Sequence, residues 1–409
     1  MKTIKDSVHD HITVDGVARA LLDTPPVQRL RHVSQLGTVN LVYPSANHTR
    51  FEHSLGVYHL ACRALEALDV AGPTADHVMA AALLHDVGHA PYSHTLEEML
   101  AAHTGRRHDD VDHLVTAEPI GPILTDHDLD PSRIAGLIAG EGRWGQLIAG
   151  ELDVDRMDYL IRDAHHTGVP YGTIDVARLV RELRFVDGEL VLGPGNIEAA
   201  ESLLVARALM NPTVYNHHVA RISKTMLRRA TARFLEASAT APATVQRMDD
   251  HDLLAALRGH HASQELVDRL DRRALYKRAV WLEYRTVPLR LREADAAGIA
   301  AVEADIAAAA DVDPHAVLVD VPVEPRMRES TARVMVGNDV WRLEDRSPLV
   351  RALREIQREQ WRCGIYAPSA VRDRVAAAAA RVLELPAEES LVDDSDRGRY
   401  ARLDEFRSA

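Results

Sequence analysis

An apolar segment that ends in a cluster of polar residues most constrains what this chain can fold into. Residues Val78–Leu84 are typical of a buried helix, and the ten residues after it, His85–His94, contain three histidines and one aspartate around Gly88 and Pro91. Such a helix can deliver polar ligands into a cleft. The same pattern also fits an ordinary helix end with hydrogen-bonded histidines, so the rest of the chain has to supply partners for a functional site.

Composition places the chain among large helical proteins. Its 409 residues are 46% hydrophobic and only 4% aromatic, and the abundance of alanine favours helices. No apolar run reaches the roughly 18 residues that a membrane span needs, and the first ten residues do not resemble a signal peptide. We therefore expect a mainly α protein that is cytoplasmic and has no membrane partner.

Charge and cysteine content narrow the function further. The net charge of −13 argues against a surface that coats nucleic acid, because such a surface needs a basic stripe. Cys62 and Cys363 are isolated in the sequence, which offers neither a disulfide framework nor a CxxC metal knuckle. Any metal site must therefore be built from histidine and carboxylate side chains.

Hydrophobic spacing predicts where the helices and strands lie. Helices are expected over residues 17–22, 27–36, 51–68, 78–84, 96–102, 134–147, 196–236 with a break at Asn211-Pro212, 253–275, 276–283, 294–310, 348–361 and 369–383. Extended segments are expected at residues 4–14, 185–192 around the turn Asp187-Gly188, 317–323 and 331–343. The mixture of strands and helices from about residue 286 indicates a small α/β part packed on a helical body.

Two imidazoles and two carboxylates lie where helices could bring them together. His53, His85, Asp86 and Asp155 form a ligand set that suits a divalent cation and leaves positions for water and substrate. Arginine binds phosphate with two parallel hydrogen bonds, and candidate arginines follow or accompany these ligands in the sequence. They are Arg50, Arg156 and Arg207. The set is consistent with a metal-dependent phosphohydrolase.

A longer series of motifs carries a family resemblance. They are Asp23-Thr24-Pro25, Gln28-Arg29-Leu30-Arg31, Gln35-Leu36-Gly37, His48–Gly56, His85–His94, Asp153–Tyr159 and Arg162–Gly168, with weaker matches at His108, Arg207, Tyr215 and Leu275-Tyr276-Lys277. In this order the chain resembles the HD superfamily of metal-dependent phosphohydrolases, and within it the deoxynucleoside triphosphate triphosphohydrolases of the sterile-alpha-motif-and-HD-domain type. The resemblance covers residues 4 to about 235, and extends loosely to about 285.

The resemblance implies a role for each matched position. His53, His85, Asp86 and Asp155 correspond to metal ligands, and His94, His89 and His108 to catalytic or pocket histidines. Arg50, Arg156 and Arg207 correspond to phosphate contacts, Tyr159, Asp163 and Tyr215 to residues around the deoxyribose, and Gln35 and Leu36 to positions near base and sugar. The metal implied is divalent, with manganese, magnesium, iron, zinc and nickel left open.

Regulation and assembly are less well defined by the sequence. Asp23, Gln28 and Arg31 match positions where relatives bind a regulatory nucleotide, although a capped, solvated helix explains them equally well. The basic residues that complete this site in relatives are not evident: His218 stands where lysine is expected, for example. The C-terminal α/β part carries no motif that points to chemistry, and we expect it to serve oligomerisation into a homodimer or homotetramer.

The predicted function is hydrolysis of a deoxynucleoside triphosphate to deoxynucleoside and inorganic triphosphate. Two alternatives stay open, namely an HD-type phosphatase or phosphodiesterase acting on another nucleotide, and a non-catalytic binder of nucleotide or nucleic acid. The predicted organisation is an HD catalytic domain, a helical extension, a small C-terminal α/β subdomain and an acidic tail, over residues 1–235, 236–285, 286–385 and 386–409.

Overall fold

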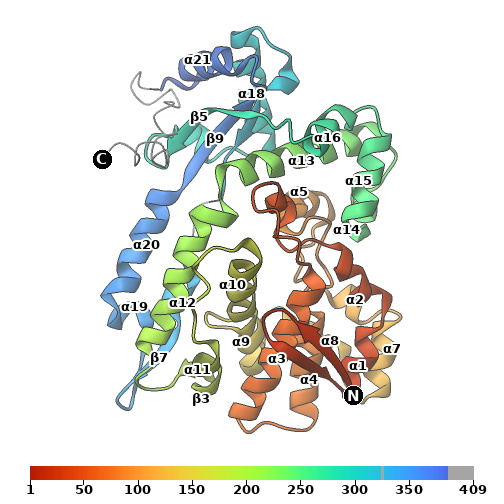
Figure 1. Ribbon diagram of the computed structural model, residues 1–409, viewed down its shortest axis with the longest axis vertical. Coiled ribbons are helices and arrows are strands. Elements are labelled where there is room, and N and C mark those ends of the chain that lie inside the picture. Colours follow the sequence, from red (N-terminus) through yellow and green to blue (C-terminus); the bar gives the residue numbers. More distant parts are fainter. Residues whose placement is uncertain (324–326, 386–409) are drawn as a thin grey trace, which may run out of the picture.

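The computed structural model describes residues 1–323 and 327–385. A helical body carries an N-terminal hairpin and two small sheets (Figure 1), so the expected mainly α fold with a minor α/β part is confirmed. No helix in these ranges is long and apolar enough to cross a membrane. The expected acidic tail, 386–409, lies outside the described residues.

Four helices position the residues of the HD motif. Helix α3 (Arg50–Ala67) packs against α4 (Pro73–Leu84) and against α10 (Val154–Thr167), while α5 (His94–Thr104) begins at the last residue of the motif. Burial of the apolar faces of these helices drives this packing. Gly56 allows α3 to approach α10, because a Cβ at this position would lie 1.9 Å from a carboxylate oxygen of Asp158.

The remaining N-terminal elements surround these helices. They are β1 (Lys2–Asp6), β2 (Asp10–Val14), α1 (Gly16–Leu22), α2 (Pro25–Arg29), the 3-10 helices η1 (Leu30–His32) and η2 (Gly37–Leu41), α6 (Asp112–Val115), α7 (Ile120–Asp126), α8 (Pro131–Ile138), α9 (Gly142–Ala149), α11 (Val176–Arg181), β3 (Leu183–Val186) and β4 (Glu189–Leu192). Strands β3 and β4 form the hairpin predicted around Asp187-Gly188.

Three predicted helices are shorter than expected or divided, and the one predicted over 253–275 forms two helices, 250–259 and 264–271. The helix predicted over 27–36 ends at His32, because Val33 is extended and accepts a backbone hydrogen bond from Arg50 at 2.9 Å. The helix predicted over 134–147 is two helices, α8 and α9. Gly140 between them has φ +81°, a conformation that glycine adopts without strain.

The long helical stretch breaks where proline predicts. Helix α12 (Ile197–Met210) passes through a π-helical turn, η3 (Asn211–Tyr215), into α13 (His218–Ala237). A π turn shifts the direction of the side chains that follow it, and this one contains Tyr215. Three shorter helices continue the chain, namely α14 (Pro242–Arg247), α15 (Asp250–Gly259) and α16 (Gln264–Asp271).

Residues 276–283, predicted to be helical, form strand β5 (Lys277–Glu283) instead. It pairs antiparallel with β9 (Arg362–Ala367), a strand that the sequence analysis missed, and β9 also pairs with β6 (Leu318–Asp320). Pairing across about eighty residues of sequence overrides the local helical pattern. This sheet lies at the end of the molecule opposite the N-terminus (Figure 1).

Residues 286–385, expected to form one small α/β subdomain, pack in two places. Helices α17 (Leu289–Arg292), α18 (Ala296–Ala310) and α21 (Arg372–Leu383) pack with β5, β6 and β9.

The second group joins the helical body. It consists of β7 (Arg333–Val336), β8 (Asp339–Arg342), α19 (Leu343–Arg346) and α20 (Pro348–Gln360). Strand β7 pairs in parallel with β4, and α20 lies beside α12 (Figure 1). The short 3-10 helix η4 (Pro314–Ala316) contacts α18, and η5 (Arg328–Thr331) contacts α19 and α20. The domain boundaries themselves stay predictions.

Candidate active site and metal centre

The four predicted metal ligands come together from three helices. His53 lies in the first turn of α3, His85 and Asp86 directly follow α4, and Asp155 lies in the first turn of α10. The Nε2 atoms of His53 and His85 are 3.3 Å apart, and Nε2 of His53 is 2.9 Å from Oδ1 of Asp155. One carboxylate oxygen of Asp86 is 3.4 Å from Nε2 of His85. Ligand atoms of His53, His85 and Asp86 all lie within 4.8 Å of one another.

The other ring nitrogen of each histidine is occupied, which suits metal binding. Nδ1 of His85 is 2.9 Å from the carbonyl oxygen of Ala82, and Nδ1 of His53 is 2.8 Å from Oδ2 of Asp158. Hydrogen bonds of this kind fix the tautomer so that the Nε2 lone pairs face the ligand centre. Arg162 donates from Nε to Oδ2 of Asp158 at 2.8 Å and holds that carboxylate in place.

The charges at the centre also fit a divalent cation. Burial lowers the pKa of His53, but the hydrogen-bonded Asp155 and Asp158, together with Asp86, raise it to about 10. The fully buried imidazole thus lies near three carboxylates, of which Asp86 is also paired with Arg50 and Asp158 with Arg162. Two imidazoles with two carboxylates form a donor set for manganese, iron, magnesium or a similar ion, and metal binding releases such a proton.

Arg50 lies beside this centre and is hydrogen-bonded to one of the predicted ligands. Its Nη1 donates to both oxygens of Asp86 at 3.0 and 3.2 Å, and its Nε donates to the hydroxyl of Ser93 at 2.8 Å. The guanidinium holds the pKa of the Asp86 carboxyl well below its usual range against the effect of burial. Arg50 also lines the cavity described below, where it can meet an anionic ligand.

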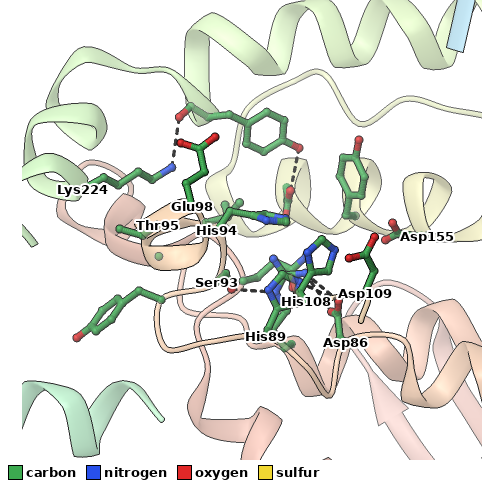
Figure 2. A pocket seen from close by; sticks show the side chains of 18 of the residues that line it. Asp86, His89, Ser93, His94, Thr95, Glu98, His108, Asp109, Asp155 and Lys224 are labelled. Atoms are coloured by element: carbon green, nitrogen blue, oxygen red, sulfur yellow. Dashed lines mark hydrogen bonds and ion pairs between the residues drawn. The ribbon is translucent and has the colours of Figure 1, made fainter. Parts of the chain in front are cut away.

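Three histidines form a second cluster next to the metal centre (Figure 2). The rings of His89 and His108 stack at 4.3 Å, and the ring of His94 lies edge-on to both, at 4.8 and 4.9 Å. Glu97 accepts hydrogen bonds from Nδ1 of His94, at 2.7 Å, and from Nδ1 of His108. One carboxylate thus orients two imidazoles and leaves their Nε2 atoms for other partners. The sequence analysis did not single out Glu97.

A pair of tyrosines stands over a buried carboxylate. The hydroxyl of Tyr215 donates to Oδ2 of Asp163 at 2.8 Å, and Nε2 of His48 is 2.7 Å from Oδ1 of the same group. The ring of Tyr159 lies 6.3 Å from the ring of Tyr215, nearly perpendicular to it. Burial and the nearby Asp163 raise the pKa of Tyr215 well above its usual value, so its hydroxyl stays a hydrogen-bond donor.

Most of these groups line one cavity of about 580 Å³, while His53 lies behind the other predicted ligands and is not part of the lining. Of the predicted site residues it contains Gln35, Leu36, Arg50, His85, Asp86, His89, His94, His108, Asp155, Tyr159, Asp163, Arg207 and Tyr215. This volume lies within the range of sites for small-molecule ligands. The cavity also has lining residues that sequence reasoning missed, namely Asn211, Asn216, Arg221, Lys224, Arg228 and Asp320. Asp320 belongs to β6, so no local motif could have revealed it.

Arg156 and the predicted regulatory residues do not line this cavity. Nη1 of Arg156 donates to the backbone oxygens of Gly150 and Glu151 and to Asp153, and Arg156 does not line the cavity. The geometry therefore gives no support to its predicted phosphate contact.

The predicted regulatory residues make local contacts. Asp23 accepts from Lys2 at 3.0 Å, and Gln28 donates to the backbone of Leu22 at 2.7 Å. Arg31 donates to Gln28 at 2.8 Å and lies over the ring of Phe51. Their role as a nucleotide site stays a prediction.

Comparisons with known proteins agree with this arrangement. The HD domain family matches residues 50–163, and the HD associated region matches residues 174–394. An uncharacterized protein of Methanocaldococcus jannaschii is 34% identical over 90% of this chain and 79% of its own length. The deoxynucleoside triphosphate triphosphohydrolase SAMHD1 of Homo sapiens is 28% identical over 68% of this chain. That match spans only 51% of the human protein.

Solved structures show the same fold. A hypothetical protein from Aquifex aeolicus superimposes with a TM-score of 0.76 and 29% identity, over 92% of this chain and 99% of that one. A phosphohydrolase from Bacteroides thetaiotaomicron gives a TM-score of 0.72 at 24% identity, over 90% of this chain and 100% of that one, and shows a shared fold. With the histidine–aspartate centre in place between α3, α4 and α10, this chain belongs to the HD-domain family of metal-dependent phosphohydrolases.

Proposed function

We propose that this protein hydrolyses deoxynucleoside triphosphates to deoxynucleosides and inorganic triphosphate. One observation carries the proposal: the histidine–aspartate centre opens into the same cavity as Arg207 and the pair formed by Asp163 and Tyr215. A cation centre beside arginine suits a polyphosphate, and a carboxylate that is hydrogen-bonded to a tyrosine suits a sugar. The names of the SAMHD1 relatives support this substrate class.

The reaction consumes one water, whose oxygen forms a new bond to phosphorus and which gives up one proton, while the nucleoside gains one proton. Water attacks the α-phosphorus, the bond between this phosphorus and the 5′-oxygen breaks, and the 5′-oxygen leaves with a proton. A divalent metal, when bound, supplies polarisation of a phosphoryl oxygen. His53, His85, Asp86 and Asp155 would hold it.

We assign His94 the delivery of the proton to the departing 5′-oxygen. Its side chain is 59% exposed into the cavity, and Nδ1 is held by Glu97 at 2.7 Å. Burial lowers the pKa of His94 below the ordinary value for histidine, while the hydrogen bond to Glu97 acts in the opposite direction. The negative charge of a polyphosphate bound beside the ring would raise this pKa again, and a protonated imidazole then suits general acid catalysis. His108 shares Glu97 and packs against His89, so the two help to fix the His94 ring.

Tyr159, Asp163 and Tyr215 would enclose the sugar. The carboxylate of Asp163 is fixed by His48 and Tyr215, so a sugar hydroxyl meets a preorganised acceptor. The rings of Tyr159 and Tyr215 would close over the sugar, where a 2′-hydroxyl would clash, and we therefore expect deoxynucleotides to be preferred over ribonucleotides. Gln35 and Leu36 line the same cavity and would lie near base and sugar. A dimer or tetramer and a cytoplasmic location are further parts of the proposal.

The test is product identification. Protein loaded in turn with manganese, magnesium, iron, zinc or nickel is incubated with each deoxynucleoside triphosphate, and products are separated by ion chromatography. We expect inorganic triphosphate and deoxynucleoside in equal amounts, with activity lost in His85→Ala and Asp86→Ala. In ¹⁸O-labelled water the label should enter triphosphate and not the nucleoside, because attack is at phosphorus.

Other outcomes would replace the proposal with one of its alternatives. Release of orthophosphate alone, or activity only on other phosphoesters in a substrate panel, would indicate an HD-type phosphatase or phosphodiesterase. Binding of single-stranded nucleic acid with a steep salt dependence, without turnover, would indicate a binding protein.

A further inference from the structure

The cavity continues beyond the tyrosines to a wall that the proposed reaction does not use. Helix α13 contributes Arg221, Lys224 and Arg228 to this wall, and strand β6 contributes Asp320. Lys224 and Asp155 lie at opposite ends of the pocket in Figure 2. A ligand with its phosphates at the metal centre therefore extends toward α13 with its other end.

The two arginines of this wall are already paired. Arg221 and Arg228 reach opposite oxygens of Asp320 at 2.6 and 2.9 Å. Arg221 also donates to the backbone oxygen of Arg362 at 2.7 Å. These contacts join α13 to the C-terminal sheet, so both guanidinium groups have a structural explanation.

Lys224 is different. Its ammonium donates to the backbone oxygen of Tyr215 at 3.3 Å, and within the described residues it forms no ion pair. An ammonium carries three donor hydrogens, so two remain for a ligand in the cavity. Burial and the nearby Arg228 lower the pKa of Lys224 to about 8, which still leaves the group largely charged at pH 7.

Tyr215 contacts both the residue that we place at the sugar and the residue that we place at the base. Its hydroxyl donates to Asp163, the carboxylate that we place at the sugar, and its backbone oxygen accepts from the ammonium of Lys224. If the sugar lies at Asp163, as the proposed function requires, the base extends along the tyrosine toward Lys224. Asn216, the next residue, lines the same part of the cavity.

We propose that Lys224 is a specificity-determining residue that selects nucleotides whose base carries a carbonyl oxygen at C6 of a purine or C4 of a pyrimidine. This inference rests on the proposed function. An ammonium can only donate hydrogen bonds. It therefore pairs with a carbonyl oxygen, whereas an exocyclic amino group at the same place is also a donor and forms no hydrogen bond with it. A polar contact of this kind discriminates between bases by roughly ten- to a hundredfold.

Two pairs of substrates isolate this chemistry. Hypoxanthine differs from adenine, and uracil from cytosine, in carrying a carbonyl where the other carries an amino group. The experiment measures kcat/KM for dITP against dATP and for dUTP against dCTP, in mixtures where each pair competes. We expect the wild-type protein to prefer the carbonyl-bearing member of at least one pair by about tenfold or more.

Variants test whether Lys224 is the cause. Lys224→Met removes the charge and keeps the length of the side chain, and should bring the ratio close to one. Lys224→Arg keeps a donor and should retain part of the preference. Lys5→Met is the matched control, since Lys5 is exposed on β1, far from the cavity lining, and should keep the wild-type ratio. Lys224→Gln serves if the methionine variant fails to fold.

The outcomes separate the two proposals. Hydrolysis to triphosphate with no preference in the wild type, or a preference that survives in Lys224→Met and Lys224→Gln, overturns the role of Lys224 and leaves the proposed function intact. Failure to hydrolyse any of the four nucleotides, with metal bound, overturns both.

Discussion

Asp250 accepts a hydrogen bond from the backbone nitrogen of Tyr92 at 2.6 Å, across 158 positions of sequence. Its other carboxylate oxygen accepts from the backbone nitrogen of Ser34 at 3.0 Å. Tyr92 and Ser93 both have φ +56°, a strained conformation for residues other than glycine. His94 follows directly. Helix α15 therefore supports the backbone that carries the proposed catalytic histidine.

Replacing this carboxylate should impair turnover more than metal binding. In Asp250→Asn one oxygen becomes an amide NH₂, which cannot accept from a backbone N–H. We expect kcat to fall about tenfold or more, since small misplacements of catalytic groups are costly, with metal content unchanged. Asp305→Asn, at an exposed position of α18, is the matched control. Equal loss of metal and activity in Asp250→Asn would contradict this explanation.

A metal assay should distinguish the predicted metal ligands from the proposed general acid, His94. His85→Ala and Asp86→Ala should lose both metal and activity, because each removes a predicted ligand. His94→Ala should keep the metal and lower kcat by about 10²- to 10⁴-fold, the usual contribution of a general acid. Metal per protein chain is measured by atomic emission, alongside triphosphate release. Loss of metal in His94→Ala would assign His94 to the metal centre.

Asp158 should matter for metal affinity although it is not a predicted ligand. It orients His53 through Nδ1 at 2.8 Å and is fully buried. Asp158→Asn should weaken metal binding by about 10- to 100-fold, as is usual for groups that orient a histidine ligand. Competition with a chelator measures the affinity, and Asp126→Asn, exposed at the end of α7, controls for the change in charge. An unchanged affinity would show that His53 does not depend on this contact.

Asp320 should stabilise the protein in a pH-dependent way. Burial raises the pKa of its carboxyl, but the charges of Arg221 and Arg228 lower this pKa by a larger amount. The pKa of Asp320 in the folded state therefore lies below the ordinary value of 3.8. Its contribution to stability is therefore complete above about pH 4, and is lost as the pH falls through the lower pKa of the folded state. Asp320→Asn leaves two arginines without their carboxylate, which costs about 3 kcal/mol.

Thermal unfolding at several pH values measures this effect. The midpoint of Asp320→Asn should lie well below that of the wild type at pH 7, and the gap should narrow below pH 4. A gap that stays constant down to pH 2 would contradict the role of the ionised carboxylate.

The sequence predicts the local elements of the body well and the C-terminal sheet poorly. The apolar spacing of residues 51–68 and the break at Asn211-Pro212 reappear as α3 and as the turn between α12 and α13. Strand β5 was predicted to be a helix, because its pairing with β9 is not encoded near residues 277–283. The division of residues 286–385 between two packing groups likewise depends on contacts with distant strands.

What the sequence by itself determined is which side chains are available to the candidate metal centre. Histidine and aspartate types, placed after a buried helix and at helix starts, specify which ligands are available, and tertiary packing brings them to within hydrogen-bonding distance of one another. Only the tertiary structure decided which residues surround these side chains and the rest of the cavity. Asp158 behind His53, Glu97 between two histidines, Asp250 under Tyr92 and Lys224 at the far wall owe their positions to contacts between distant elements. Such contacts depend on how helices pack, and a motif describes only residues close in sequence.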